Sequence, residues 1–267
     1  MCGRFVSATP IDVLARYFDV DIDDVAVPAL PARYNIAPTD EVAVVVRTAA
    51  RRRLEALRWG LLPFWAKDPR SGAKMINARA GTLAVNNAYR RAFRARRCLV
   101  PADGFYEWKR VPGRARTQPV YIRRADGEPM AMAGLWERWR PPDRRDDGTA
   151  TVRSCTIVTG EPNELVADVH DRMPVLLPRP AWDAWLDPDN HDLEALAGLL
   201  VPAPAALLVL HPVSSAVNHV GAEGPELVEP FDPRSRPLGD GPGDGPGEGP
   251  GEGPGDDAGG ATQAALF

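Results

Sequence analysis

Cysteine and histidine are scarce in this chain, which has three cysteines and four histidines in 267 residues. The cysteines form no CxxC pair and no zinc-ligand spacing, so we expect neither a metal nor another cofactor. An odd number of cysteines also argues against a disulfide framework. Cys98 and Cys155 lie in apolar, strand-like contexts, where a cysteine usually serves as a small buried hydrophobic residue.

Long apolar segments are also absent. No apolar run reaches the roughly 18 residues that a membrane-spanning helix needs, and the first residues lack the basic-then-apolar pattern of a signal peptide. We therefore expect a cytoplasmic protein with no membrane partner. Hydrophobic residues still make up 44% of the chain, which is enough for a substantial core.

The net charge of −4 hides an uneven distribution of charge. From Gly239 onward the chain has six acidic residues and no Lys or Arg, which leaves 32 basic against 30 acidic residues before it. The arginines of this body gather in three clusters, at 51–53, 90–97 and 109–116. Such clusters can bind a polyanion, but charge alone favours a solvated, arginine-rich surface.

The spacing of apolar residues predicts many strands with short helices between them. The expected helices are 10–18, 87–95, 160–170, 179–186 and 192–200; the expected strands are 41–48 and 54–60 around a turn at Arg51–Arg53, a strand-turn-strand over 97–108, then 119–124, 129–139, 152–160 and 205–213. This irregular order predicts one α+β domain over residues 1–232, with a barrel-like, β-rich core and short peripheral helices. Residues 141–150 are a predicted surface loop.

Residues 233–267 differ in composition from the rest. From Gly239 they repeat Gly-Pro-Gly followed by an acidic residue, a pattern that cannot bury a core and repels itself. We predict a disordered, extended spacer. Large apolar residues return only in the closing QAALF, which suggests a peptide ligand on a tether.

The chain begins MCGRF. An initiator methionine before a small residue is normally removed, which would leave Cys2 with a free α-amine and a thiol. The amine, with a pKa near 8, and the thiol are both nucleophiles at neutral pH. Together they can take up one aldehyde, first as an imine and then as a five-membered thiazolidine. The other chemistry open to this pair is acyl transfer, with the thiol as nucleophile and the amine as its base.

Three further stretches carry groups suited to a carbonyl centre that needs proton transfers. INARAGT places Asn77 and Arg79 two residues apart, on one face if the segment is extended. Glu107 follows a turn and stands between aromatic residues that would desolvate it, and His170 precedes Asp171. Each of these residues is more often structural when taken singly, and no chemical rule links their spacings.

These stretches carry a family resemblance. MCGRF, YNIAPT, RWGLLPFWAKD, NARAGT, RRCLVPADGFYEW and VHDRMPVLL occur in this order. Over residues 2 to about 220 they closely resemble the SOS response-associated peptidase (SRAP) family of abasic-site-processing proteins. The resemblance implies a protein that binds abasic single-stranded DNA and captures the ring-opened aldehyde on Cys2 as a thiazolidine. This would shield the lesion during replication and the SOS response, and self-removal of Met1 would be the peptidase reaction.

The resemblance also implies roles for particular residues. Asn77 would position the cysteine amine and the opened sugar, Glu107 would shuttle protons, and His170 would help open the sugar. Arg4 and Arg79 would contact phosphates, and Trp65 would be part of a wedge that stacks against or parts the bases. Arg172 would be a further DNA-binding residue. The chain departs from the family at Gly81, where many members have a glutamate, and at Ala66, where a second aromatic residue often stands.

The end of the chain suggests a protein partner. QAALF resembles the short Gln-x-x-Leu-Phe peptides that dock on the bacterial sliding clamp, with Gln263, Leu266 and Phe267 as anchors. A flexible tether would raise the effective concentration of the protein near replicating DNA. We expect a monomer associated with the nucleoid.

Two other functions remain open at this point. One is an N-terminal-nucleophile amidohydrolase like the class II glutamine amidotransferases, which also begin with cysteine and glycine, although the motifs of their glutamine pocket are missing. The other is a clamp-tethered module that binds single strands without any chemistry.

Overall fold

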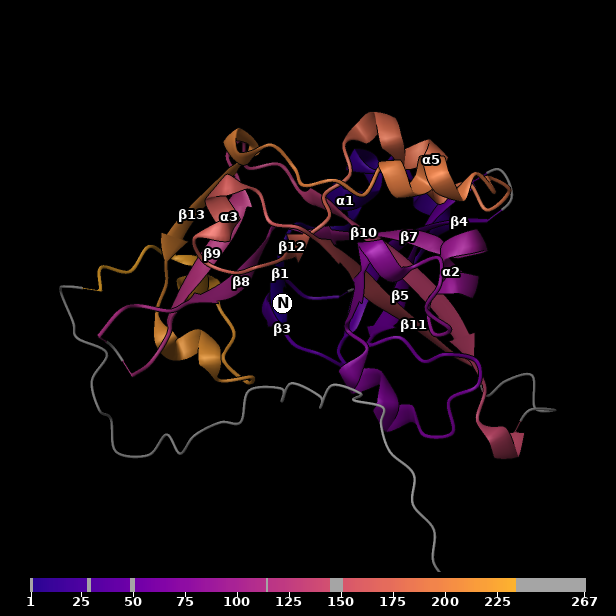
Figure 1. Ribbon diagram of the computed structural model, residues 1–267, viewed down its shortest axis with the longest axis horizontal. Helices are drawn as coiled ribbons and strands as arrows, with labels where there is room; N and C mark the ends of the chain where they lie inside the picture. The colour runs from indigo at the N-terminus through magenta and orange to yellow at the C-terminus, as the bar shows by residue number, and fades with distance from the viewer. Residues whose placement is uncertain (1, 28–29, 49–50, 114, 145–150, 234–267) are drawn as a thin grey trace, which may run out of the picture.

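The structure is a computed structural model that describes residues 2–27, 30–48, 51–113, 115–144 and 151–233. It contains two β-sheets that meet near the start of the chain (Figure 1). The first sheet has five strands in the order β13 (Leu208–Pro212), β9 (Gln118–Arg124), β8 (Gly104–Lys109), β1 (Arg4–Ser7) and β3 (Arg33–Ile36).

The second sheet closes on itself. Its order is β12 (Met173–Pro174), β11 (Val152–Gly160), β10 (Met130–Trp139), β7 (Arg97–Ala102), β4 (Glu41–Thr48), β5 (Arg51–Trp59) and β2 (Val25–Ala26), with β6 (Asn77–Arg79) parallel to β11. Because β11 also pairs in parallel with β5, the five strands β11, β10, β7, β4 and β5 form a closed barrel. The expected β-rich α+β fold with a barrel-like core is thereby confirmed.

The short helices α1 (Ile11–Tyr17), α2 (Arg90–Ala95), α4 (Trp182–Leu186) and α5 (Leu193–Gly198) cover one side of this sheet. The short helix α3 (Glu164–Ala167) packs elsewhere, and its Val166 belongs to the same apolar cluster as Cys2. Short 3-10 segments occupy Ile22–Asp24, Pro69–Lys74, Ala80–Thr82, Pro142–Arg144, Arg179–Ala181, Ala205–Leu207, Ser215–Asn218 and Pro225–Val228. In the described residues no helix has the length and apolar character that a membrane crossing requires.

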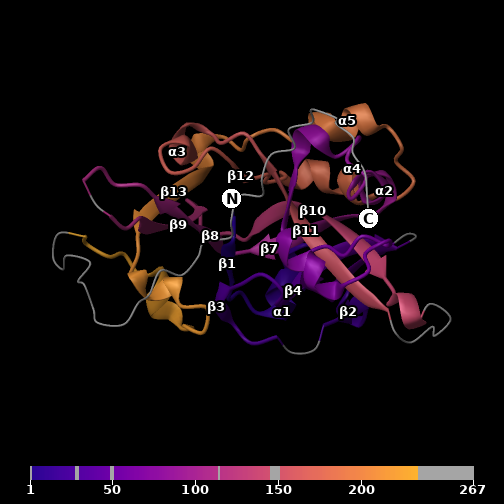
Figure 2. The same cartoon turned by 60° about the horizontal axis from the view of Figure 1, so that its bottom comes forward.

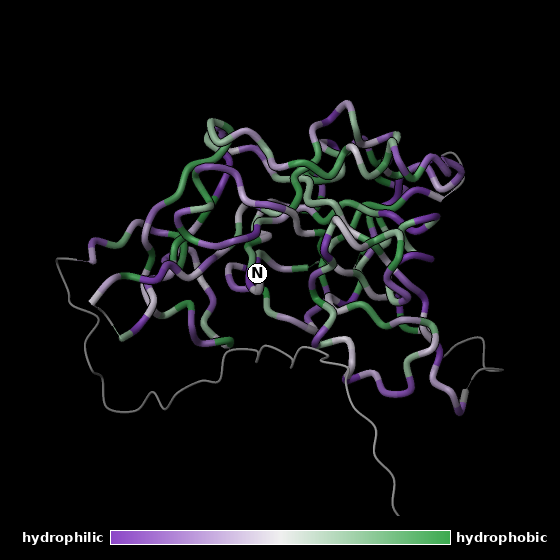
Figure 3. Tube along the Cα trace, viewed as in Figure 1, coloured by the Kyte–Doolittle hydropathy of each residue, from purple (hydrophilic) through white to green (hydrophobic). Residues whose placement is uncertain are grey.

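Two apolar clusters hold these layers together. One joins the outer face of the barrel to α1, α2, α4 and α5, as Val45, Phe93 and Trp185 illustrate. The other joins the opposite face to the five-stranded sheet and contains Cys2 and Trp59. β4 and β10 are therefore buried at nearly all positions, and the hydropathy trace shows green, hydrophobic segments in the interior of the molecule (Figure 3).

Several expected boundaries are corrected by the structure. Arg51–Arg53 do not form a turn: they belong to β5, and Arg52 pairs with Arg47 across the ladder with β4. The helix expected at 160–170 is reduced to α3, which begins after Asn163, whose Oδ1 accepts a hydrogen bond from Val166 N at 3.0 Å. The strand expected from 205 begins at Leu208, after a 3-10 segment.

Cys98 and Cys155 are buried and free, as their contexts indicated. The short strands β1 and β3 were not expected. The clamp-binding anchors Gln263, Leu266 and Phe267 lie outside the described residues, as does the rest of 234–267.

Candidate active site

The site forms where β1 connects the two sheets. β1 pairs with β8 on one side and with β3 on the other, so the start of the chain is held inside the first sheet. Phe5 packs edge-on against Trp59 of the barrel, with ring centroids 5.1 Å apart. Cys2, two residues before β1, is completely buried in the apolar cluster shared by both sheets. β1, β8 and β12 lie near one another in both views (Figures 1 and 2).

Asn77 fixes the backbone of Cys2. It lies on β6, where it pairs with Ile157 of β11. Its Nδ2 donates a hydrogen bond to the Cys2 carbonyl oxygen at 2.9 Å. The backbone carbonyl oxygen of Asn77 accepts a hydrogen bond from the Tyr89 hydroxyl at 3.1 Å. The Asn77 Oδ1 atom is buried and has no hydrogen-bond partner among the described residues. This oxygen can therefore accept a hydrogen bond from a nitrogen or hydroxyl group that enters the site.

Glu107 is a buried carboxyl group on β8, with 2% of its surface exposed. Burial is the main cause that raises the pKa of Glu107 to about 7, and the negative charge of Asp171 raises it further. Both protonation states are consequently populated at neutral pH. Such a group can either donate or accept a proton, which is what the chemistry at a carbonyl carbon requires.

The Cys2 thiol is held in its neutral form. Burial raises the pKa of this thiol far above its usual value, and the nearby charge of Glu107 raises it further. The Sγ atom lies 3.8 Å from the carbonyl oxygen of Arg4, a weak hydrogen bond at most. A protonated thiol is a poor nucleophile and resists oxidation, so reaction at Cys2 would begin at a different atom.

His170 follows α3 on the segment that leads into β12. Its Nδ1 accepts a hydrogen bond from Arg172 N at 3.0 Å and lies 2.9 Å from Asp171 Oδ1. Burial lowers the pKa of His170, against the opposing effect of Asp171, so the ring is neutral at pH 7. Asp171 of this segment is close enough to Glu107 for its negative charge to raise the pKa of that carboxyl group.

The residues predicted to bind DNA differ in their surroundings. Arg4 is half-buried, and its Nη1 donates to Asn35 Oδ1 at 2.8 Å and to the Val217 carbonyl at 3.1 Å. Arg79 is exposed at the end of β6, and the side chain of Arg172 is 23% exposed. The structure thus places Arg79 on the strand of Asn77 and Arg172 next to His170.

Trp65 is half exposed on the loop after β5, at 50%. Phe64, which the sequence reasoning overlooked, is equally exposed, and the Arg91 guanidinium lies 4.7 Å from its ring centroid. Ala66 is buried, and its carbonyl accepts a hydrogen bond from Trp139 Nε1. The second exposed aromatic residue therefore precedes Trp65 here, and the adjacent letters PFW were the signal for it.

Two further residues beside the site were also missed. Tyr89 anchors the Asn77 backbone, as described above. Thr159 lies opposite Arg79 in the pairing of β6 with β11, and its buried hydroxyl has no hydrogen-bond partner among the described residues. Neither residue belongs to a motif that chemistry alone would single out.

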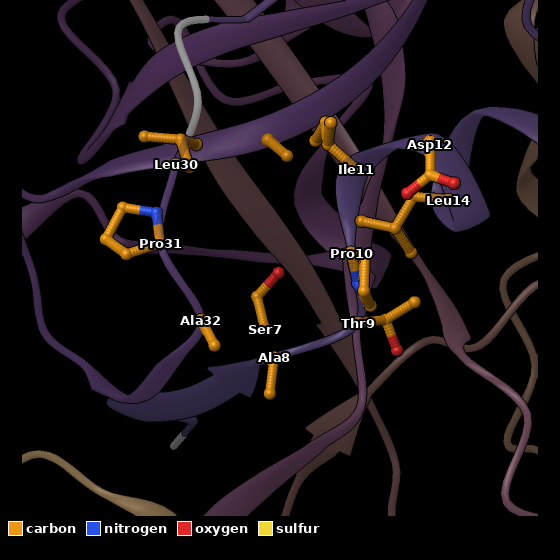
Figure 4. Close-up of a pocket in the computed structure, with 11 residues that line it drawn as sticks. Ser7, Ala8, Thr9, Pro10, Ile11, Asp12, Leu14, Leu30, Pro31 and Ala32 are labelled. Carbon is orange, nitrogen blue, oxygen red and sulfur yellow. The ribbon is translucent and has the colours of Figure 1, made fainter.

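A cavity of about 310 Å³ lies at the far end of β1, away from Cys2 (Figure 4). None of the predicted site residues lines it. Its walls are Ser7, Ala8, Thr9, Pro10, Ile11, Asp12, Leu14, Leu30, Pro31, Ala32 and Ala43. It has no pair of groups suited to acid–base chemistry, since Asp12 is already bound to Arg16 at 3.0 Å.

Known proteins share both the sequence and the fold. The family model described as SOS response associated peptidase (SRAP) matches residues 1–220. The abasic site processing protein YoqW of Bacillus subtilis is 39% identical over 234 residues, which are 86% of this chain and 99% of the relative. The abasic site processing protein YedK of Escherichia coli is 33% identical over 236 residues, which are 86% of this chain and 100% of the relative.

Two crystal structures have a similar fold. A protein from Bacteroides thetaiotaomicron superimposes with a TM-score of 0.72 at 24% identity, and the match covers 86% of this chain and 100% of that one. A protein from Bordetella bronchiseptica superimposes with a TM-score of 0.66 at 27% identity, covering 80% and 100% of the two chains. At such low identity the first of these likenesses concerns the fold alone.

Proposed function

The chain belongs to the SOS response associated peptidase family, and from this membership and the geometry around Cys2 we propose that it processes abasic sites in single-stranded DNA. The relatives named above are abasic site processing proteins. The observation that carries the proposal is that Cys2 is buried beside Glu107, a carboxyl group with a pKa of about 7, while Asn77 holds the Cys2 backbone.

The proposed reaction joins the ring-opened aldehyde of the abasic site to Cys2 after Met1 has been removed. The α-amine nitrogen attacks the aldehyde carbon, and the resulting carbinolamine loses water to give an imine. The thiol sulfur then attacks the imine carbon, and the thiol proton passes to the nitrogen. The product is a thiazolidine, and one water molecule is released for each aldehyde captured.

The neighbouring side chains suit these steps. Glu107 in its protonated form gives a proton to the departing hydroxyl group, and as a carboxylate it relays the thiol proton to the imine nitrogen. Asn77 Oδ1 accepts a hydrogen bond from the amine, and His170 moves protons on the sugar as it opens. Arg4, Arg79 and Arg172 contact phosphates, and Trp65 stacks on a base.

The state of the thiol favours this reaction over the alternatives. Acyl transfer needs the thiolate as the first nucleophile, whereas the buried Cys2 thiol is protonated. In thiazolidine formation the amine attacks first, and the thiol reacts only with an imine already bound beside it. A module that only binds DNA would not need a buried carboxyl group beside Cys2 whose pKa is about 7.

Intact-mass spectrometry tests the proposal in one sample. The protein alone is expected to lack the mass of Met1, and mixing with an abasic oligonucleotide is expected to add the mass of the DNA minus one water. An oligonucleotide with an intact base serves as the control. Active protein that retains Met1, or the absence of an adduct with the abasic strand, contradicts the proposal.

We also propose that the closing QAALF binds the bacterial sliding clamp. Deleting residues 263–267 is expected to abolish retention on immobilised clamp while abasic capture proceeds at the rate of the full chain, because the site lies wholly within residues 2–233. The matched control replaces Ala264 and Ala265 with serine, which keeps all three anchors. Undiminished clamp binding by the shortened chain would rule out this partner.

A further inference from the structure

The three arginine clusters of the sequence have different surroundings in the structure. Each arginine of the first cluster lies within 4.0 Å of a carboxylate. Arg51 lies 3.7 Å from Asp24, and Arg52 lies 2.8 Å from Asp183. Paired charges of this kind attract a distant polyanion only weakly, so this cluster is part of the surface ion-pair network of the fold.

The second cluster is partly structural as well. Arg97 is buried and donates to backbone carbonyls, including those of Trp185 and Phe93. Arg96 forms an ion pair with Glu137 at 2.8 Å, and Arg91 stacks on Phe64.

The third cluster lies at the loop end of the β8–β9 hairpin, where the chain passes from β8 to β9. Lys109 ends β8, and Arg110 and Arg116 are exposed on the connection to β9. None of these three cations forms an ion pair with a carboxylate in the part of the chain that the structure describes. The hairpin end projects at the left of the molecule in Figure 1, beyond the body of the two sheets.

This unpaired charge begins next to the proposed site. Lys109 is two residues beyond Glu107 on the same strand, so the two side chains leave β8 on the same face. At about 3.3 Å per residue, Arg110 lies roughly 10 Å along the chain from Glu107. Like charges held together on one hairpin repel each other, and neutralisation by phosphates relieves this repulsion while releasing counterions.

We propose that Lys109, Arg110 and Arg116 form an arm that binds the phosphates of single-stranded DNA on one side of the captured nucleotide. This inference rests on the proposed function for the identity of the polyanion and adds to it the surface that holds the flanking strand. The arm contacts phosphates and not bases, so it binds the strand beside the lesion independently of its sequence.

A pair of matched triple variants of the full chain tests the arm. K109Q/R110Q/R116Q removes the arm's charge, and R16Q/R51Q/R70Q removes three exposed arginines that each lie beside a carboxylate: Asp12, Asp24 and Asp68. Both variants lower the net charge by three. The measurement is the affinity for an unmodified single strand as a function of salt, by fluorescence anisotropy.

The slope of log K against log salt is expected to fall by about 2 in the arm variant, at roughly 0.7 per phosphate contact, and to stay near the wild-type value in the control. An unchanged slope in the arm variant would overturn the proposal. Equal changes in the two variants would also overturn it, because they would reflect total charge alone.

Abasic oligonucleotides with a long flank on only the 5′ or only the 3′ side locate the arm relative to the lesion. The arm variant is expected to bind one of these weakly and the other as wild type does, and at saturating DNA to capture both completely. The arm is contradicted if the variant binds both oligonucleotides equally weakly, or if it binds both as wild type does. A wild-type protein that captures neither oligonucleotide contradicts the proposed function instead, so the two failures are distinguishable.

Discussion

Cys2→Ser is expected to abolish the heat-stable adduct with abasic DNA, a loss of ~100-fold or more, because it removes the atom that closes the ring. The amine of residue 2 remains, so the serine variant can still form an imine. That imine hydrolyses unless it is reduced. We therefore expect a covalent band from the variant only when borohydride is present, and a band from the wild-type protein with or without it, measured on denaturing gels after heating.

The other buried cysteines provide the control for this experiment. Cys98 and Cys155 belong to the same apolar cluster as Cys2, and burial raises the pKa of each thiol too. Neither thiol, however, has Glu107 among the causes of its pKa shift. Cys98→Ala and Cys155→Ala are expected to capture abasic DNA as wild type does. A heat-stable band from Cys2→Ser without borohydride would show that another nucleophile carries the adduct.

The strands of the core were predictable because burial leaves a clear pattern in the sequence. β4 is almost continuously apolar since both of its faces are covered, and β10 is likewise buried. The pairing of β5 with β11, which closes the barrel, left no such pattern. It joins segments about a hundred residues apart. Parallel strands are not connected by a tight turn, so no turn motif in the sequence indicates this pairing.

The candidate site was predictable as a set of residue types but not as an arrangement. Cys2, Asn77, Glu107 and His170 lie on four separate segments, which are positioned by pairings between distant strands: β1 with β8, β6 with β11 and β12 with β11. The chemistry of Cys2 could be derived from its position in the chain. Its burial, and the resulting protonated thiol, could not, because they depend on the packing of Phe5 against Trp59.

The charge of the surface illustrates the same difference. The segments 51–53 and 109–116 are both strongly basic in the sequence, with three and four cations, and their composition gives no reason to prefer one cluster. Only the structure shows that Asp19, Asp24 and Asp183 lie beside the arginines of 51–53. The described cations of 109–116 have no carboxylate partner among the described residues. Local sequence reports how many charges are present, and the tertiary fold decides which of them are neutralised.

Glu107→Gln is expected to slow both formation and reversal of the adduct by about 100-fold, within the usual range for losing a general acid–base group. DNA affinity should change little, because the buried carboxyl group is not part of the phosphate-binding surface. The measurement is single-turnover adduct formation, with the dissociation constant obtained separately on intact single strands. Glu41→Gln, at an exposed position at the start of β4, is the control and should leave both quantities unchanged.

The pH dependence of the rate separates a proton shuttle from a merely structural carboxyl group. The attacking amine must be neutral, so the rate rises towards a pKa near 8. Expulsion of the hydroxyl group needs Glu107 protonated, so the rate falls as the pH passes above about 7, the pKa to which burial raises this group. The wild-type profile is therefore expected to be bell-shaped, and Glu107→Gln should keep only the rising limb. A bell that survives in the variant would assign the falling limb to another residue.

Protein stability reports the same pKa without any DNA. Between the usual glutamate pKa of 4.5 and about 7, the folded protein binds a proton at Glu107 that the unfolded chain does not, so wild-type stability falls as the pH rises through this window. Glu107→Gln lacks that loss, and its free energy of unfolding should improve relative to wild type by roughly 3 kcal/mol between pH 4 and pH 8. If this difference stays constant with pH, Glu107 is already ionised at neutral pH and cannot supply the proton that the dehydration step needs. If the stability difference changes with pH as expected but Glu107→Gln keeps the bell-shaped rate profile, Glu107 is protonated but does not donate the proton. Another group in the site then supplies it.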